Sequence, residues 1–151
     1  MILSRHDQPR LLHWAALQKG DGWWPDAQAI GIYHKTTKPS DLCAVVVLER
    51  IGRHTADVHI KSDGRRRWAS RRIVKALFSI AFDTLDLNRM EARIATGNVA
   101  SLQLVKRLGF RLEATLRDGH GPGRDAILAA ITRKDCRWIT QPVAQATTKE
   151  D

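Results

Sequence analysis

The segment Asn98–Phe110 reads NVASLQLVKRLGF and decides the fold more than any other part of the chain. Asn98 is a favourable N-cap residue, and apolar residues recur after it at helical spacing as far as Leu108. Cations occupy the last turn, where the helix dipole favours positive charge, and Gly109 is a typical residue at a helix end. The segment therefore predicts a capped helix that closes at Gly109, with a strand over Phe110–Leu116 after it.

A basic turn, a helix and a strand precede this segment. Residues 63–70 read DGRRRWAS, and apolar residues from Trp68 to Leu85 recur in one broad stripe. That stripe predicts a helix of about five turns with one buried face. Apolar residues then alternate with charged ones over Arg89–Ala95, which predicts a strand with one face in water.

The N-terminal part predicts one helix and three strands. Pro9 suits the first turn of a short helix that ends before Gly20. Trp23 and Trp24 follow in an irregular connection, where either one of them lines a groove or both cover the edge of the core. Alternating and β-branched residues then predict an antiparallel meander with strands at Ile30–His34, Cys43–Leu48 and Thr55–Ile60.

The C-terminal part predicts a strand, a turn and a tail. The run Ala126–Ile131 reads AILAAI, short enough for a strand buried on both faces, and Arg133–Ile139 is expected to form a helical turn. The composition becomes polar from Thr140. We therefore expect a single domain over residues 1–139 and a disordered tail over residues 140–151.

Composition and charge restrict the class of protein. An apolar share of 43% in 151 residues suffices for one buried core, and no apolar run approaches the roughly 20 residues of a membrane span. The formal charge of +9 predicts attraction to phosphates, acidic proteins or nucleic acid. Cys43 and Cys136 lie far apart without metal-type spacing, so we expect reduced, half-buried thiols and no metal site. Without a signal peptide at Met1–Asp7, a cytoplasmic protein is expected.

The turn at residues 63–70 is a candidate anion site. A strand that turns directly into a helix N-terminus presents free N–H groups and the positive end of the helix dipole. Arginines crowd this helix start, where each cation costs about 0.3 to 1 kcal/mol, and they are Arg65, Arg66, Arg67, Arg71 and Arg72. A bound anion would offset that cost. The alternative is that the guanidinium groups extend into water without a ligand.

Taken together, these motifs resemble the cofactor-binding core of the GNAT superfamily of N-acyltransferases, in its ribosomal-protein N-acetyltransferase-like branch. The resemblance covers about half of the chain, and its motifs are Trp68-Ala69-Ser70, Asn88-Arg89, Asn98-Val99-Ala100-Ser101 and Leu108-Gly109-Phe110. It implies an α+β fold with a mostly antiparallel, twisted sheet of six to seven strands flanked by helices. It also implies acetyl-CoA as the cofactor and an amine as the acceptor.

The resemblance assigns residues to the cofactor. It puts the backbone of the strand at Ile60 and Lys61 beside the pantetheine arm, with Asn98 near the same arm. The pyrophosphate would lie on the turn formed by Arg65, Arg66, Arg67, Trp68 and Ala69. For Asn98 the alternative is a helix cap without contact to a ligand.

The resemblance also implies direct attack of the amine on the thioester, with one group taking the amine proton and another protonating the leaving thiolate. Ser101 is the matching hydroxyl for the thiolate, although it is also placed to complete the helix cap. No residue identifies itself as the base. Asp57 and His59 are candidates beside Glu49, and the alternative is that they form the solvated face of their strand.

Two departures from the family pattern favour a second hypothesis. Arg67 stands where the family has a glycine that lets the phosphate approach the backbone, and the chain is short where the family opens with a strand. Part of the acceptor site would then be missing. The stretch HIKSDGRRRWASR resembles GNAT-like proteins of bacteriophages, so the alternative is an inactive structural protein of a virion that contacts other phage proteins. A basic protein associated with nucleic acid is the third hypothesis.

Overall fold

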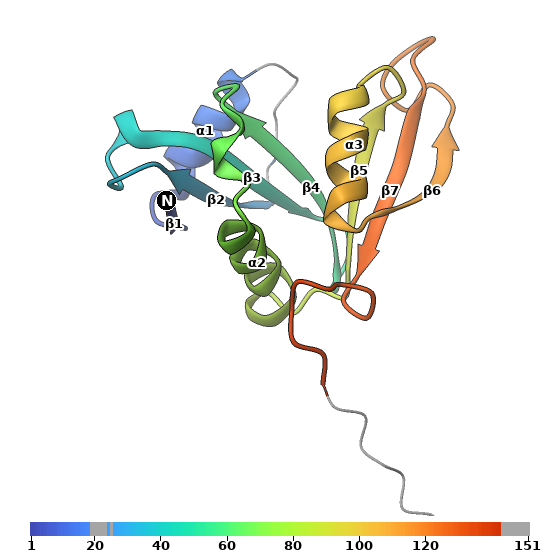
Figure 1. Cartoon of the computed structure of the whole chain (residues 1–151). Helices are drawn as coiled ribbons and strands as arrows, with labels where there is room; N and C mark the ends of the chain where they lie inside the picture. Colours follow the sequence, from blue (N-terminus) through green and yellow to red (C-terminus); the bar gives the residue numbers. More distant parts are fainter. Residues whose placement is uncertain (19–23, 25, 143–151) are drawn as a thin grey trace, which may run out of the picture.

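The computed structural model describes residues 1–18, 24 and 26–142, without the side chain of Arg66. Its strands are β1 (Ile2–Ser4), β2 (Ala27–Tyr33), β3 (Leu42–Arg50), β4 (Thr55–Ser62), β5 (Arg89–Ala95), β6 (Arg111–Leu116) and β7 (Ala126–Thr132). They form one sheet in the order β1-β2-β3-β4-β5-β7-β6 (Figure 1). Only β4 and β5 pair in parallel. The predicted α+β class with a mostly antiparallel sheet is confirmed.

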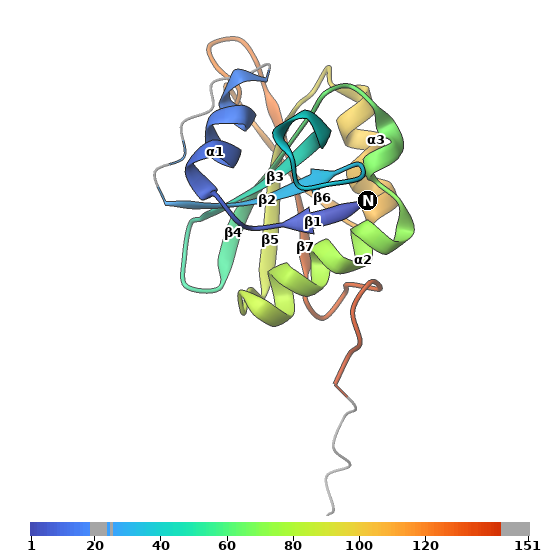
Figure 2. The same ribbon diagram turned by 90° about the vertical axis from the view of Figure 1, so that its left-hand side faces the viewer.

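Helices cover both faces of the sheet. They are α1 (Gln8–Leu17), α2 (Arg71–Ser79) and α3 (Val99–Leu108). Figure 2 shows α1 on one side of the strands and both α2 and α3 on the other. The larger apolar core lies between the sheet and α2 and α3, and a smaller one lies under α1. None of the helices in the described ranges is long and apolar enough to cross a membrane.

The helix predicted over Trp68–Leu85 begins later than expected. Ser70 is its N-cap, because the Ser70 hydroxyl accepts from the Ile73 N–H at 3.4 Å, and α2 therefore starts at Arg71. Trp68 ends a separate 3₁₀ turn, Arg66–Trp68, and is buried in the larger core. At its far end α2 passes into a π-helical turn, Ile80–Thr84, so the end of the predicted helix is nearly right and its start is wrong.

The expectation that the chain lacks an opening strand is wrong. The strand β1 precedes α1 and pairs antiparallel with β2, with Leu3 opposite Ile32. The expected helical turn at Arg133–Ile139 is also wrong, because the described chain forms turns there, with the Cys136 N–H donating to the Arg133 carbonyl at 3.2 Å. Most of the predicted tail, residues 143–151, lies outside the described residues, and so does Trp23.

The two cysteines are more buried than expected. Cys43 and Cys136 are both free thiols and are 7% and 1% exposed. Burial raises the pKa of each thiol above its ordinary value, which keeps both protonated and unreactive.

Gly31 allows α1 to pack closely on β2. A Cβ at this position would lie 2.7 Å from Leu11 Cδ2 and 2.8 Å from Tyr33 Cε2, and both of those side chains are fully buried. We expect Gly31→Ala to lower the free energy of unfolding by about 1–3 kcal/mol through overpacking. Gly52→Ala is the matched control, since its Cβ would meet its nearest atom at 3.9 Å. Equal melting temperatures for the two variants would contradict this account.

Candidate functional site

The sheet splits between β4 and β5. These strands pair only from Thr55 opposite Arg89 to Asp57 opposite Glu91, although β4 continues to Ser62. Beyond this short vertex the two strands diverge toward the top of Figure 1. The far half of β4 therefore has a neighbour, β3, on one side and an open edge on the other.

The backbone of β4 offers hydrogen-bonding groups to this opening. The Asp63 N–H donates to the Cys43 carbonyl at 3.0 Å, and Lys61 lies opposite Val45 two positions earlier. Because alternate residues of a strand point their N–H and C=O groups to opposite sides, Lys61 faces β3 while Ile60 and Ser62 face the opening. Of the two predicted pantetheine contacts, Ile60 is thus placed to make backbone hydrogen bonds and Lys61 is not.

The basic turn closes one end of the opening and can accommodate phosphate. Gly64 has a φ of 89°, and a Cβ there would meet nothing within 4 Å. The first N–H groups of α2, at Arg71 and Arg72, have no intrahelical partner and form the positive end of its dipole. Arg67, which replaces the family's glycine, is exposed.

Two of the residues predicted to contact the pyrophosphate, Trp68 and Ala69, pack against the core. The Trp68 side chain is 6% exposed and belongs to the core, so Trp68 can meet a ligand only through its backbone. Ala69 is partly buried against the same core. Arg65 is tied to the turn, since its N–H donates to Asp63 Oδ1 at 2.9 Å, and the side chain of Arg66 lies outside the described residues.

A carboxylate and histidine cluster lies at the vertex of the opening. Glu49, Asp57 and His59 come from the neighbouring strands β3 and β4, and their ligand atoms all lie within 4.8 Å of one another. His59 Nε2 lies 3.3 Å from Glu49 Oε2, and the Trp24 ring packs against His59 with centroids 5.3 Å apart. Both His59 and Glu49 keep about a third of their side-chain surface exposed, at 34% and 30%.

An ion-pair ladder continues from this cluster across the sheet. Arg93 donates to Asp57 and, at 3.2 Å, to Glu91, while Arg89 Nε donates to Glu91 at 2.9 Å. Arg89 also reaches Glu113 on β6. One carboxylate oxygen of Asp57 is buried without a partner among the described atoms. Burial raises the pKa of Asp57 above its ordinary value, even though the charges of Arg93 and His59 oppose that change.

The wall opposite β4 is the start of α3. Asn98 Oδ1 accepts from the Ser101 N–H at 3.1 Å, so Asn98 does cap the helix, and its amide nitrogen remains available. No described atom hydrogen-bonds to the Ser101 hydroxyl, which is partly exposed. A hollow of about 590 Å³ borders this wall and is lined by residues 95–98 and by His120 and residues 123–125 of the β6–β7 loop.

Of the three predicted catalytic residues, Asp57 and His59 lie together on β4, whereas Ser101 lies on α3. The catalytic roles of all three stay predictions. Sequence analysis missed the contacts of His59 with Trp24 and of Asp57 with Arg93. Glu49 was named as a neighbour of these residues, but its position opposite Asp57 was not predicted. Counting outward from the β3–β4 turn would have found that pairing, because Glu49 lies directly opposite Asp57 in the hairpin.

Comparison with known proteins gives the family. Residues 6–111 match the model of the acetyltransferase (GNAT) domain, and this range includes the split strands, the basic turn and both walls of the opening. The chain belongs to the GNAT family. The prediction of the superfamily is thereby confirmed, and so is acetyl-CoA as the cofactor, because GNAT acetyltransferases use it as acyl donor.

Solved structures share the fold. A chimera of spermidine N-acetyltransferase SpeG from Vibrio cholerae and hSSAT has a TM-score of 0.71 at 14% identity, covering 89% of this chain and 98% of the other. Mutant forms of the Vibrio cholerae SpeG give 0.62 at 17% identity, with 73% of this chain and 66% of that one covered. SpeG in complex with CoA and spermine gives 0.61 at 18% identity, with 74% and 68% covered. The present chain therefore spans about two thirds of the length of the Vibrio cholerae SpeG chains. A search of curated proteins finds no significant match.

The ion pair of Glu113 with Arg89 should make the free energy of unfolding depend on pH. Hydrogen bonds from Arg89 hold the pKa of Glu113 below its ordinary value. A carboxyl whose pKa is lowered by folding stabilises the protein above its unfolded pKa, and that contribution disappears as pH falls through the folded value. We expect Glu113→Gln to lower the free energy of unfolding at neutral pH by at most about 1 kcal/mol, because the pair is exposed, and to lower the melting temperature accordingly.

The difference between Glu113→Gln and wild type should shrink as the solution is acidified, and thermal melts over an acid-to-neutral series measure it. Asp26→Asn is the control, because Asp26 is exposed and has no described partner. A Glu113→Gln difference that grows on acidification would refute the role of the ladder.

Proposed function

We propose that this GNAT protein is an acetyl-CoA-dependent N-acetyltransferase whose acceptor amine reaches the vertex of the opening from the α1 face of the sheet. One observation carries the proposal. The open edge of β4 begins at the position where Asp57, His59 and Glu49 gather, so a binding strand and a proton-accepting cluster share one end of the cleft. The acceptors that fit are a protein N-terminus, a lysine or a small amine.

The cofactor would be held mainly by backbone groups. Ile60 and Ser62 present N–H and C=O groups along the open edge of β4, which suits the amides of a pantetheine arm. The N–H groups of Arg71 and Arg72 suit the pyrophosphate. The exposed guanidinium of Arg67 offers a charged donor to the same phosphates in place of the close approach that a glycine allows.

His59 is the proposed base. A carboxylate only accepts hydrogen bonds, so the pair with Glu49 assigns the ring proton to Nε2 and leaves the lone pair on Nδ1. Nδ1 has no hydrogen-bond partner in the described part of the chain. Glu49 orients the ring and stabilises it after protonation, and Trp24 limits its rotation. His59 Nδ1 would take the proton that the acceptor amine loses.

Ser101 is the proposed partner of the leaving sulfur. Acetyl-CoA supplies an acetyl group activated as a thioester. The Ser101 hydroxyl stands in the first turn of α3 and is not engaged by the helix cap, which uses the Ser101 N–H instead. It is therefore available to donate its proton to the thiolate as the carbon–sulfur bond breaks, and the solvent restores that proton.

The structure changes two of the observations that favoured an inactive virion component. These two are the expected lack of an opening strand and the arginine in place of the family's glycine, while the resemblance of the stretch HIKSDGRRRWASR to phage proteins stays a prediction. β1 occupies the place of that strand, and Arg67 is exposed beside an open Gly64. Catalysis is the hypothesis that the arrangement of the cleft supports better.

Ser101→Ala tests the leaving-group role. We expect calorimetric titration with acetyl-CoA to show binding for wild type and equal binding for the variant, while kcat for a panel of amines falls about 10²-fold or more. Thiol release measures turnover. Ser79→Ala is the control, because Ser79 lies at the end of α2 and bonds to Asp83. Absence of wild-type binding at millimolar acetyl-CoA would refute the proposed function, and an unchanged kcat would leave Ser101 a capping residue.

His59→Gln tests the base. We expect kcat to fall by about 10²–10⁴-fold while acetyl-CoA binding is retained, because the variant lacks the ring nitrogen that would take the amine proton. Glu49→Gln should give a smaller loss, because the ring keeps its lone pair. His13→Gln on the exposed face of α1 is the matched control. A His59→Gln variant with the wild-type kcat would show that another group accepts the proton.

A further inference from the structure

The α2 and α3 side of the molecule carries a surplus of positive charge. Residues 64–82 contain six Arg or Lys residues and no carboxylate, and residues 97–112 contain three and no carboxylate. We call the following set the basic face: Arg71, Arg72, Lys75, Lys106, Arg107 and Arg137, all of which are exposed.

The side chains of the basic face are not neutralised by the protein. No ion pair involves any of the six among the described residues. Acids that lie near this face in the sequence already have partners, since Asp135 pairs with Arg111 at 3.5 Å, Asp83 pairs with Arg133 at 2.9 Å and Glu113 pairs with Arg89. Unpaired cations that repel one another are stabilised when a polyanion binds to them.

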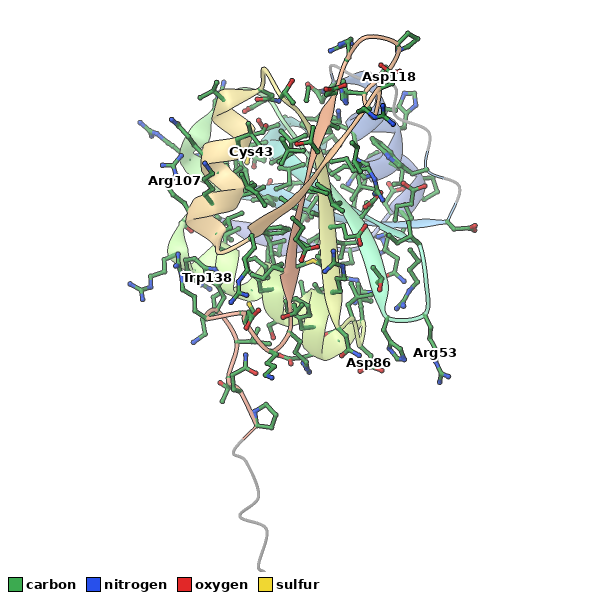
Figure 3. All side chains as sticks on the ribbon, turned by 90° about the vertical axis from the view of Figure 1, so that its right-hand side faces the viewer. Cys43, Arg53, Asp86, Arg107, Asp118 and Trp138 are labelled. Atoms are coloured by element: carbon green, nitrogen blue, oxygen red, sulfur yellow. The ribbon has the colours of Figure 1, made fainter. Side chains whose placement is uncertain are left out.

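Contacts connect the two helices into one surface. Arg137 donates to the Arg107 carbonyl at the end of α3, and its guanidinium lies 5.0 Å from the centre of the Trp138 ring. Trp138 in turn stacks on Phe78 of α2, with ring centroids 6.2 Å apart and planes 2° from parallel. The C-terminal segment thus joins the last turn of α3 to α2, and Figure 3 shows Arg107 projecting outward from α3.

The basic face extends beyond the proposed cofactor site. Arg71 and Arg72 belong to the turn at which the pyrophosphate would bind. Lys75 lies a full turn further along α2, and Lys106 and Arg107 lie in the last turn of α3, at the opposite end of that helix from its N-cap Asn98. The few phosphates of one CoA molecule do not account for cations on two helices and a C-terminal segment. A ligand that covers them all has a long row of negative charges.

We propose that the basic face binds the phosphodiester backbone of a nucleic acid. Duplex DNA carries one negative charge per roughly 1.7 Å of its axis, which suits cations distributed over two helices and the C-terminal segment. All six side chains are exposed Lys or Arg residues, which suits contact with phosphate, and such contact is independent of base sequence. This inference stands apart from acetyl transfer, because it uses residues outside the catalytic cluster.

The salt dependence of binding tests the proposal. The probes are a fluorescently labelled DNA duplex and a single-stranded RNA of equal length, and fluorescence anisotropy is measured over a series of salt concentrations. Contacts from Lys75, Lys106, Arg107 and Arg137 predict a slope of about −3.6 in log K against log salt for the duplex. Binding without salt dependence, or no binding to either probe at low salt, would overturn the proposal.

A charge-matched pair of variants locates the surface. The test variant is Lys75→Gln with Lys106→Gln and Arg107→Gln, and the control is Lys35→Gln with Lys38→Gln and Arg53→Gln. All six side chains are exposed, and Figure 3 shows Arg53 on the opposite side of the molecule from Arg107. We expect the test variant to lose about 2.7 of the slope and at least about 50-fold in affinity at 100 mM salt. Equal losses in both variants would mean that net charge alone attracts the probe, which overturns the site.

Two further measurements separate this inference from the proposed function. Binding to the duplex should persist with saturating CoA, and complete displacement by CoA would show that the probe merely fills the cofactor cleft. Poly-glutamate bound as tightly as the duplex would indicate an acidic protein partner instead. If calorimetry shows no acetyl-CoA binding while the test variant still loses the duplex, the proposed function fails and the basic face stands.

Discussion

The short parallel pairing of β4 with β5 is the constraint on which the rest of this GNAT structure depends. Three residue pairs hold the strands together at Thr55, Ala56 and Asp57, and beyond them each strand follows its own neighbours. Backbone groups of β4 that a longer pairing would have used are therefore left to a ligand. The same vertex determines which side chains meet, because it brings the ladder of β5 against the hairpin of β3 and β4.

Charge is divided between the two sides of the sheet. On the α1 side, Arg89 and Arg93 pair with carboxylates from three strands, which are Asp57, Glu91 and Glu113. On the α2 and α3 side, cations gather with few carboxylates among them. The basic face therefore contributes six cations without an ion pair among the described residues to the net charge of +9.

Local signals were sufficient for much of the fold. The helix α3 was predicted to its last residue because Asn98 and Gly109 are residues that a helix end requires, and Gly109 indeed takes a φ of 99°. The start of α2 was misplaced because Trp68 falls on the apolar stripe, whereas the Ser70 cap decides where the helix begins. β1 was missed because three residues carry no periodicity, and the strand exists only through its pairing with β2.

The candidate site was less predictable than the fold, because it also depends on pairing between strands. The register of β4 against β3 decides whether the backbone N–H and C=O groups of Ile60 or those of Lys61 face the opening. The sequence of β4 alone does not give this register. The approach of Arg93 to Asp57 links residues 36 positions apart and requires the β4 to β5 contact to be known. Family resemblance suggested the region of the site, whereas the partners of each side chain could be found only from the tertiary structure.

β6 is an edge strand of the sheet, and its features disfavour pairing with a strand of another chain. An edge strand offers unpaired N–H and C=O groups that another chain can adopt. β6 has an irregular register between Leu112 and Ala114, at Glu113, and this charged residue is bonded to Arg89 while Arg111 is paired with Asp135. A distorted edge with charges of both signs is a poor template for a further strand, so solubility is built into the same ladder that orders the cleft.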